Sequence, residues 1–356
     1  MEIDQLYNGS VELLKKLIKT PSLSTQEHDA ADIIRKHLDE LGIHYKTFMN
    51  NTWCFNKHWD DQKPVVLLNS HIDTVKPVDG WTYDPFGASL EDGKLIGLGS
   101  NDAGAPLVSL LATFAYFFPK ENLPFNLIFA ATAEEESSGV NGMAQLVKLL
   151  QRVDFAIVGE PTQMKLAVAE KGLLVIDCMV KGKAGHAARN EGINSIYLAI
   201  DEINKIRNYK FERISSLLGE VKMTVTLIEA GFQHNVVPDS CKFVIDVRTN
   251  ECYSNDEVIE TISGLLNCNM KARSRRLNSS GIEMDHPFVK RVQLFGIECY
   301  GSPTLSDQSL MPYRSVKMGP GDSARSHTAN EFIFLKEIKE GINLYIELLE
   351  GLVLKK

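Results

Sequence analysis

The chain has 356 residues, 44% of them hydrophobic, which predicts about two globular domains with a substantial core. The formal net charge is −8, the sequence pI is about 5.7, and no long basic block interrupts the chain, which argues against nucleic acid as a partner. The short basic cluster at residues 273–276 is typical of a solvated strand or linker.

Cysteine usage and the N-terminus favour a cytoplasmic protein. The six cysteines form no Cys-x-x-Cys pair, and several lie in apolar, strand-like runs, as reduced core thiols do. The first residues show no basic-then-apolar signal pattern. The apolar stretch at 107–118 is too short to span a bilayer, so we expect no membrane partner.

The first predicted elements are two helices and a strand. Residues 8–18 and 28–41 show helical spacing of apolar positions, with Pro21 between them, and Ser-Thr-Gln-Glu at 24–27 is a candidate capping box. The apolar run at 64–69 is bounded by turn residues and predicts a buried strand.

His71 and Asp73 follow this strand. Because strand side chains alternate, both emerge on the same face. This suits a metal-binding histidine whose second ring N–H is taken by a carboxylate. Standing alone, a His-x-Asp pair at a strand end is more often a surface pair.

Asp102 lies in the glycine-rich segment 97–104, directly before an apolar helix predicted from residue 106 to residue 118. Aspartate at a helix start is commonly an N-cap. The alternative is a carboxylate that bridges two metal ions.

Three consecutive glutamates, Glu134, Glu135 and Glu136, follow a second apolar strand at 125–132. Such a run usually marks a solvated helix start, where the helix dipole favours acidic residues. Here it follows a fully apolar strand. A nearby divalent cation would remove the repulsion and let one glutamate bind metal while its neighbour acts as a base.

Two further candidates are Glu160, after a third strand at 155–159, and His327, in a glycine-rich loop before the last helix. Singly, they are typical of a turn residue and a loop residue or cap. Jointly, the strands deliver acids and histidines to their C-terminal ends, the edge where open α/β sheets bind ligands. Two histidines and three carboxylates suit zinc, cobalt or manganese.

The pattern changes after about residue 167. Strands are predicted at 175–180, 221–228, 242–247 and 270–275, and helices at 193–206 and 255–266, the β-α-β-β-α-β order of a ferredoxin-like unit. Strand and helix signals resume after residue 285 and supply His327, so this unit is an insertion. We predict an α/β catalytic domain at 1–166 and 276–356, with a mixed, mostly parallel sheet flanked by helices, and an inserted α+β domain at 167–275.

In order and spacing, these segments resemble the zinc-dependent deacylases that include acetylornithine deacetylase, succinyl-diaminopimelate desuccinylase, aminoacylase and carboxypeptidase G. The resemblance covers essentially the whole chain. Gly-Glu-Pro-Thr at 159–162 and Gly-Pro-Gly at 319–321 look most like the acetylornithine deacetylase branch. The matching segments are 70–74, 97–104, 132–137, 159–162, 182–186 and 319–327.

The resemblance implies two divalent ions, zinc or cobalt, and a set of residues with separate roles. His71 and Glu160 bind one ion, Glu136 and His327 bind the other, Asp102 bridges them, and Asp73 orients His71.

The glutamate run leaves one ambiguity of register. The family pattern Thr-x-Asp-Glu-Glu makes Glu135 the general base, with Glu134 standing where the Asp falls, and a slip of one residue would make Glu134 the base and Glu135 the ligand. Leu98 departs from the arginine common at that position, which should affect packing more than chemistry.

The resemblance also assigns residues of the inserted domain. His186 matches a histidine that stabilises the oxyanion, often in the partner subunit's active site, and Asn235 and Arg248 match substrate-contacting positions. Arg325 is a further candidate for a substrate carboxylate. The plainer alternatives are a loop histidine for His186 and a cross-strand ion pair for Arg248. We expect a homodimer through the inserted domain.

The activity implied is hydrolysis of the amide bond of an N-acyl amino acid, first of all N-acetylornithine in arginine biosynthesis. Alternatives are deacylation of N-acetylcitrulline, N-succinylornithine, N-succinylcitrulline, succinyl-diaminopimelate or acetyl-lysine, and dipeptide cleavage. A different class, an inactive binding module, would be expected to lack a ligand or the base, and this chain has lost none.

Overall fold

The computed structural model describes residues 2–150 and 152–354. Within them the chain forms two compact units. The first comprises the chain up to Val168, Gly281–Tyr300 and the segment from Ser306 onward, and the second comprises Ala169–Ser280 and Gly301–Leu305. Each unit has a hydrophobic core of its own.

The first unit contains most of a nine-stranded mixed sheet in the order β1-β2-β6-β3-β7-β17-β8-β15, with β16 paired to β8. Its four central strands, β6, β3, β7 and β17, run parallel. The strands β1 and β2 form an antiparallel edge. The bounds are β1 Tyr45–Phe48, β2 Asn51–Phe55, β3 Val65–His71, β6 Asn126–Thr132, β7 Phe155–Val158, β8 Leu166–Glu170, β15 Ser280–Gly281, β16 Cys299–Ser302 and β17 Arg314–Lys317.

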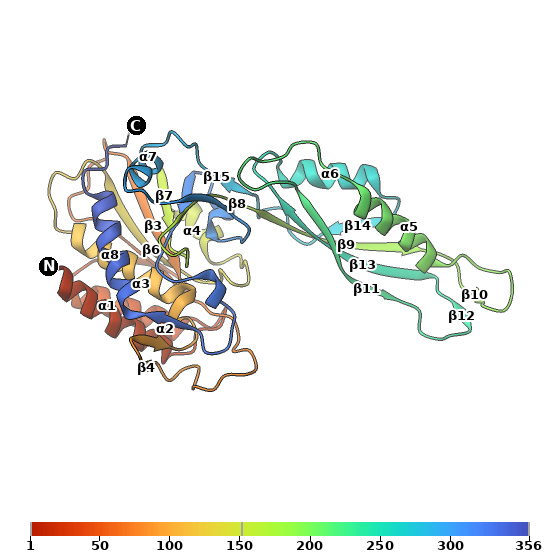
Figure 1. Ribbon diagram of the computed structural model, residues 1–356, viewed down its shortest axis with the longest axis horizontal. Coiled ribbons are helices and arrows are strands. Elements are labelled where there is room, and N and C mark those ends of the chain that lie inside the picture. Colours follow the sequence, from red (N-terminus) through yellow and green to blue (C-terminus); the bar gives the residue numbers. More distant parts are fainter. Residues whose placement is uncertain (1, 151, 355–356) are drawn as a thin grey trace. The chain divides into compact units, whose positions relative to one another are not determined.

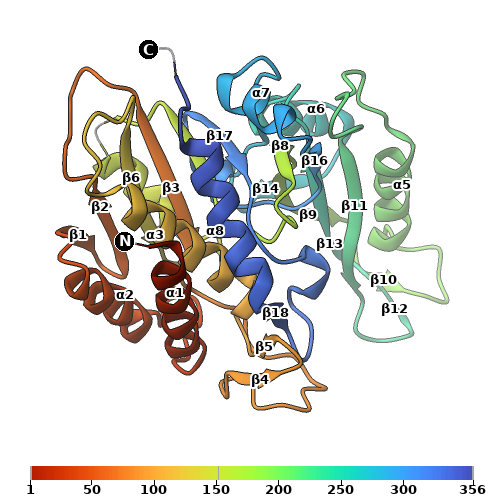
Figure 2. The same ribbon diagram turned by 60° about the vertical axis from the view of Figure 1, so that its left-hand side comes forward.

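Helices cover both faces of this sheet, which explains why its central strands are buried along almost their whole length. On β3, Val66 and Leu68 point into the core shared with α1, α3 and α8, which lie side by side over one face (Figures 1 and 2). Val65 and Leu67 point to the opposite face, which α4 covers. The helices are α1 Ile3–Ile18, α2 His28–Glu40, α3 Ala105–Phe117, α4 Met143–Leu149, α7 Pro287–Leu294 and α8 Leu335–Leu349. The predicted α/β class is confirmed.

A small antiparallel sheet in the order β18-β5-β4 supports the loops beside the site. Its strands are β4 Ser89–Glu91, β5 Lys94–Ile96 and β18 Phe332–Phe334, and Phe332 pairs with Ile96. This pairing brings together segments more than 230 residues apart in the chain.

The predicted capping box at residues 24–27 is wrong. Helix α2 begins at His28, and its N-cap, Glu27, makes no side-chain capping bond. Ser24 instead donates its hydroxyl to Asp73, 2.6 Å away, and the Glu27 carboxylate accepts the side-chain amide of Asn50 and the backbone N–H of Glu134, at 2.8 and 3.2 Å. Tertiary partners therefore take the side chains that local capping would use.

The second unit is a four-stranded antiparallel sheet in the order β11-β13-β9-β14, with α5 and α6 on one face (Figure 1). Buried and part-buried residues alternate along β9, because helices cover only one face. The pattern is the β-α-β-β-α-β arrangement expected. A two-stranded ribbon of β10 and β12 was not expected, since two-residue strands leave no periodic signal. The bounds are β9 Gly172–Lys181, β10 Gly185–His186, α5 Ser195–Asn208, β11 Lys222–Ala230, β12 Val236–Val237, β13 Ser240–Thr249, α6 Asn255–Leu265 and β14 Asn269–Ala272.

Across residues 2–150 and 152–354, no helix has both the length and the apolar character needed to cross a membrane.

Candidate metal centre

The four parallel strands of the first unit end at the same edge of the sheet, and each is followed by a candidate ligand segment. His71 ends β3, the glutamate run follows β6, Glu160 follows β7, and β17 leads into the loop that carries His327. The carboxyl edge of a parallel sheet is where such side chains converge. The ligands are therefore brought together by topology rather than by sequence proximity.

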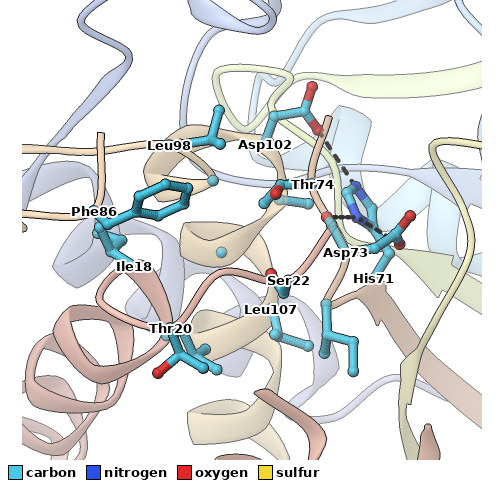
Figure 3. Close-up of a pocket in the computed structure, with 15 residues that line it drawn as sticks. Ile18, Thr20, Ser22, His71, Asp73, Thr74, Phe86, Leu98, Asp102 and Leu107 are labelled. Carbon is cyan, nitrogen blue, oxygen red and sulfur yellow. Dashed lines mark hydrogen bonds and ion pairs between the residues drawn. The ribbon is translucent and has the colours of Figure 1, made fainter. Parts of the chain in front are cut away.

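The His71 ring lies between Asp73 and Asp102 (Figure 3). Its Nε2 atom is 3.4 Å from Oδ1 of Asp102 and 3.8 Å from Oε1 of Glu160. This nitrogen is buried and has no hydrogen-bond partner among the described residues. A buried ring nitrogen that faces two carboxylates without bonding either fits a metal ligand.

His327 faces the other side of Asp102. Its Nε2 atom is 3.1 Å from Oε2 of Glu136 and 3.7 Å from Oδ2 of Asp102. The two oxygens of Asp102 are thus directed to different histidines. Ligand atoms of His71, Asp102 and Glu136 lie within 4.8 Å of one another, as do those of His71, Glu135 and Glu160.

The charges of the cluster are poorly balanced by the protein alone. Burial, followed by the nearby Asp102 charge, raises the pKa of Glu160 to about 8. Burial also raises the pKa of Glu135 well above its ordinary value. The hydrogen bond to Glu136 raises the pKa of His327 to about 9. Divalent cations would compensate the crowded carboxylates that otherwise hold protons, so the donor set fits metal.

Asp73 has a wider role than the one expected. Nδ1 of His71 is 2.9 Å from the backbone oxygen of Asp73 and 3.5 Å from its carboxylate. The carboxylate accepts the backbone N–H groups of Glu135 and Glu136, at 3.0 and 3.1 Å, and the Ser24 hydroxyl. Asp73 therefore backs the histidine and also holds the glutamate turn. The contribution of Ser24 has no sequence signal, because it lies 49 residues away.

The glutamate run forms a turn, so the alternative of a solvated helix start is excluded. Glu134 adopts a left-handed φ of +60° and is buried. Its carboxylate accepts the backbone N–H and the side-chain amide of Asn141, at 3.0 and 2.9 Å. Glu135 and Glu136 are the two that approach the histidines. This geometry favours the register with Glu135 and Glu136 as the chemically active pair.

Asp102 is not an N-cap. Helix α3 begins at Ala105 with Gly104 as its cap, and Asp102 lies in the preceding turn, Ser100–Gly104. A cavity of about 20 Å³, enough for one water molecule, lies beside Asp102 and His71 (Figure 3).

The arginines expected to bind substrate already have carboxylate partners. Arg325 forms a two-bond ion pair with Glu337, at 2.7 and 3.2 Å, in the first unit. Arg248 forms the same kind of pair with Asp246, at 2.8 and 3.1 Å, in the second unit. Asp246 is on the same strand as Arg248, so the suggested cross-strand pair is wrong in that detail.

His186 and Asn235 belong to the β10–β12 ribbon of the second unit. His186 is exposed, pairs with Val236, and accepts the backbone N–H of Ala188 through Nδ1. The backbone carbonyl oxygen of Asn235 accepts the backbone N–H of Ala187. The side-chain Oδ1 atom of Asn235 is buried and has no partner among the described residues. The ribbon thus places these two predicted residues close together.

Sequence reasoning missed a buried polar chain beneath the glutamate turn. Asn69 donates to the Thr132 hydroxyl, and Thr132 donates to Asp307, both at 2.8 Å. The Asp307 charge adds to the burial that raises the pKa of Glu135. The available signal was a polar residue, Asn69, inside an otherwise apolar strand.

This assembly of two histidines and several carboxylates at the mouth of a parallel sheet defines a candidate dinuclear metal centre of the hydrolase type. Residues 67–351 match peptidase family M20/M25/M40, and the chain belongs to this family. It is therefore a metal-dependent hydrolase of amide or peptide bonds.

Curated relatives extend over the chain. A succinyl-diaminopimelate desuccinylase from Blochmanniella pennsylvanica is 26% identical over 98% of this chain and 99% of its own length. Another from Buchnera aphidicola is 28% identical over 74% of each chain. Neither carries the acetylornithine deacetylase name, so the expected placement in that branch rests on its two motifs alone.

Solved structures share the fold. Aminopeptidase PepT from Bacillus cereus has a TM-score of 0.77 and 19% identity, covering 97% of this chain and 98% of its own. The YXEP protein of Bacillus subtilis, described as a dinuclear metal binding peptidase, has a TM-score of 0.74 and 17% identity, covering 99% and 100%.

Proposed function

We propose that this protein is a two-metal amidohydrolase that removes the acyl group from an N-acyl amino acid, with N-acetylornithine as the first expected substrate. The observation that carries the proposal is the placement of Asp102, with one oxygen toward each histidine and Glu136 close by. A shared carboxylate with two histidines is the arrangement of two-metal hydrolytic sites.

Five side chains would hold the ions. His71 and Glu160 serve one, Glu136 and His327 the other, and Asp102 both. Zinc or cobalt held there would polarise the scissile carbonyl and lower the pKa of a bound water from 15.7 to about 7.

Glu135 is the proposed general base. Its carboxylate lies in one cluster with His71 and Glu160, where it would take a proton from water and return it to the leaving amine. The Asp73 carboxylate accepts the backbone N–H of Glu135 at 3.0 Å, which restrains the backbone position of this base.

His186 is the proposed donor to the oxyanion. Its Nδ1 atom accepts the Ala188 N–H, so the neutral ring carries its proton on Nε2. That leaves Nε2–H free to donate. Such a donor typically contributes about 2.7–4 kcal/mol to transition-state stabilisation.

The acyl group and the amine side chain depend on contacts outside the ligand set. Asn235, Arg248 and Arg325 stay the proposed partners of a substrate carboxylate. A carboxylate that binds either arginine would compete with Asp246 or Glu337. The names of the curated relatives favour a succinyl group, whereas the motifs at 159–162 and 319–321 favour an acetyl group.

The test is a substrate panel with the zinc- or cobalt-loaded protein. It contains acetyl and succinyl derivatives of ornithine, citrulline, lysine and diaminopimelate, with dipeptides as the peptidase arm. We expect the highest kcat/KM for N-acetylornithine. A higher value for a succinyl substrate would replace the acetyl assignment, and cleavage of dipeptides alone would exclude the deacylase class. Stable metal binding without turnover of any member would favour a binding module.

The second unit is the proposed dimerisation element. Its edge strand β11 exposes Leu227 and Ile228, with 62% and 56% of their surfaces accessible. An unpaired edge strand that carries apolar side chains is commonly covered by a second copy.

A further inference from the structure

We propose that Glu331 and Asn101 form a reciprocal clamp that sets the spacing between Asp102 and His327, with Glu331 as the main positioning residue. This inference rests on the metal centre proposed above, but not on the identity of the substrate. Neither residue is one of the five proposed ligands.

Glu331 binds the backbone of the segment that carries Asp102. Its carboxylate accepts three converging N–H groups: Gly99 at 3.1 Å, Asn101 at 2.8 Å and Asp102 at 2.9 Å. The side chain is almost completely buried, with 2% of the residue exposed. Three backbone N–H groups that converge on one buried side chain fix the path of the turn directly at the bridging residue.

Asn101 binds the segment that carries His327. Its side-chain oxygen accepts the backbone N–H of Asp322 at 2.9 Å, and its amide nitrogen donates to the carbonyl of Asp322 and the hydroxyl of Ser326. Asn101 is fully buried. Each ligand-bearing segment therefore contributes one side chain that holds the backbone of the other.

The small sheet places the two halves of this clamp. The β5–β18 pairing ends immediately before residue 97 on one strand and begins immediately after Glu331 on the other, where Gly97 donates its N–H to the Glu331 carbonyl. Glu331 is thus anchored by a strand while its side chain reaches the turn. Only three residues separate it from His327, which itself adopts a left-handed φ of +58°.

The consequence concerns metal affinity. Asp102 has one oxygen 3.4 Å from the His71 nitrogen and the other 3.7 Å from the His327 nitrogen. A small shift of the turn that carries Asp102 would move this residue toward one histidine and away from the other. Residues that orient ligands typically affect metal affinity by about 10- to 100-fold, and we expect the ion shared with Glu136 and His327 to show this loss.

The experiment measures metal binding without substrate. Metal-free wild type, Glu331→Gln, Glu331→Ala and Asn101→Ala are titrated with Co²⁺ by calorimetry and visible absorption, and zinc content is measured after dialysis. We expect the wild type to bind two ions. In each variant, the affinity for one of the two ions should fall by about 10- to 100-fold. Because the clamp is reciprocal, the two substitutions should not be additive. The double variant Glu331→Gln, Asn101→Ala should lose less metal binding free energy than the sum of the losses in the two single variants.

The matched control is Glu202→Gln in the second unit. Glu202 is also a buried glutamate, 7% exposed, that accepts a backbone N–H, from Asn267 at 2.8 Å. It should alter stability but leave both ions at wild-type affinity. Wild-type affinity for both ions in folded Glu331→Gln and Asn101→Ala overturns the clamp, even if Glu331→Ala does not fold. A wild type that binds no ion refutes the metal centre instead.

Discussion

The three consecutive glutamates occupy three different environments. Glu134 bonds Asn141 and is turned away from the histidines, Glu135 lies near His71, and Glu136 approaches His327. Identical side chains are thus separated in role by the turn that Asp73 holds, rather than by any difference in their chemistry.

Substitutions along this run test the roles. Glu135→Gln should lower kcat by about 10²–10⁴-fold while both ions stay bound, because the amide cannot accept the proton. Glu136→Gln should weaken the binding of one of the two metal ions. Steady-state kinetics and elemental analysis of the same preparations measure both effects.

Glu134→Gln is the matched control for that series. Its amide would turn a donor toward an Asn141 donor, so we expect a loss of about 1–3 kcal/mol in the free energy of unfolding with nearly normal turnover. If the Glu134→Gln protein is inactive but fully metallated, the general base is Glu134 and not Glu135.

At the scale of elements, helix α6 has a complete capping box. The Ser254 hydroxyl accepts the Glu257 N–H, and the Glu257 carboxylate accepts the Ser254 N–H at 2.8 Å. Glu257 also pairs with Arg213 at 2.7 Å. The Ser254 hydrogen bond, followed by the Arg213 bond, lowers the pKa of Glu257 to about 2 from its ordinary value of 4.5.

This shift predicts a pH-dependent contribution to stability. A carboxyl group with a depressed folded-state pKa stabilises the protein fully above its unfolded pKa, near 4.5, and loses that contribution as the pH falls toward 2. The stability difference between wild type and Glu257→Gln should therefore be largest at pH 7 and shrink between pH 4.5 and 2. Urea unfolding of the metal-free proteins at several pH values measures it. A difference that grows on acidification contradicts the assignment.

Elements with a long periodic signal could be predicted from the sequence, and so could the edge at which the ligands meet. The apolar runs at 64–69 and 175–180 predicted β3 and β9, because residues that are buried in a strand leave a readable hydrophobic signal. The side-chain partners could not be predicted. Ser24 left its expected capping role for Asp73, and Arg325 bonds Glu337, because these choices depend on segments that only the fold brings together.

At the scale of the molecule, the proposed ions should contribute to stability as well as to catalysis. Chelation should abolish hydrolysis and lower the Tm, and zinc or cobalt should restore both. At 100-fold excess over the Kd, one bound ion adds about 2.7 kcal/mol to the free energy of unfolding. Calorimetry with elemental analysis measures this. Full activity of verified metal-free protein would refute metal dependence.

The proposed dimer also makes a prediction about delivery of His186. Subunits carrying His186→Ala and subunits carrying Glu135→Gln are each expected to be inactive. If His186 acts in the partner's site, mixed dimers contain one intact combination, and activity should reappear on subunit exchange. An inactive mixture with proven exchange would show that His186 does not act across the interface, and a fully active monomer at low concentration would remove the dimer.

The order of strands in the large sheet has a consequence for how the protein matures. Strand β17 pairs with β7 in parallel, yet the two are separated in the chain by the whole second unit. While the chain is being synthesised, β7 has an open edge until residue 317 emerges. His71, Asp102 and Glu160 are present long before His327. The ligands proposed for the first ion are therefore all synthesised before the second unit, whereas those proposed for the second ion include His327, which is synthesised after it.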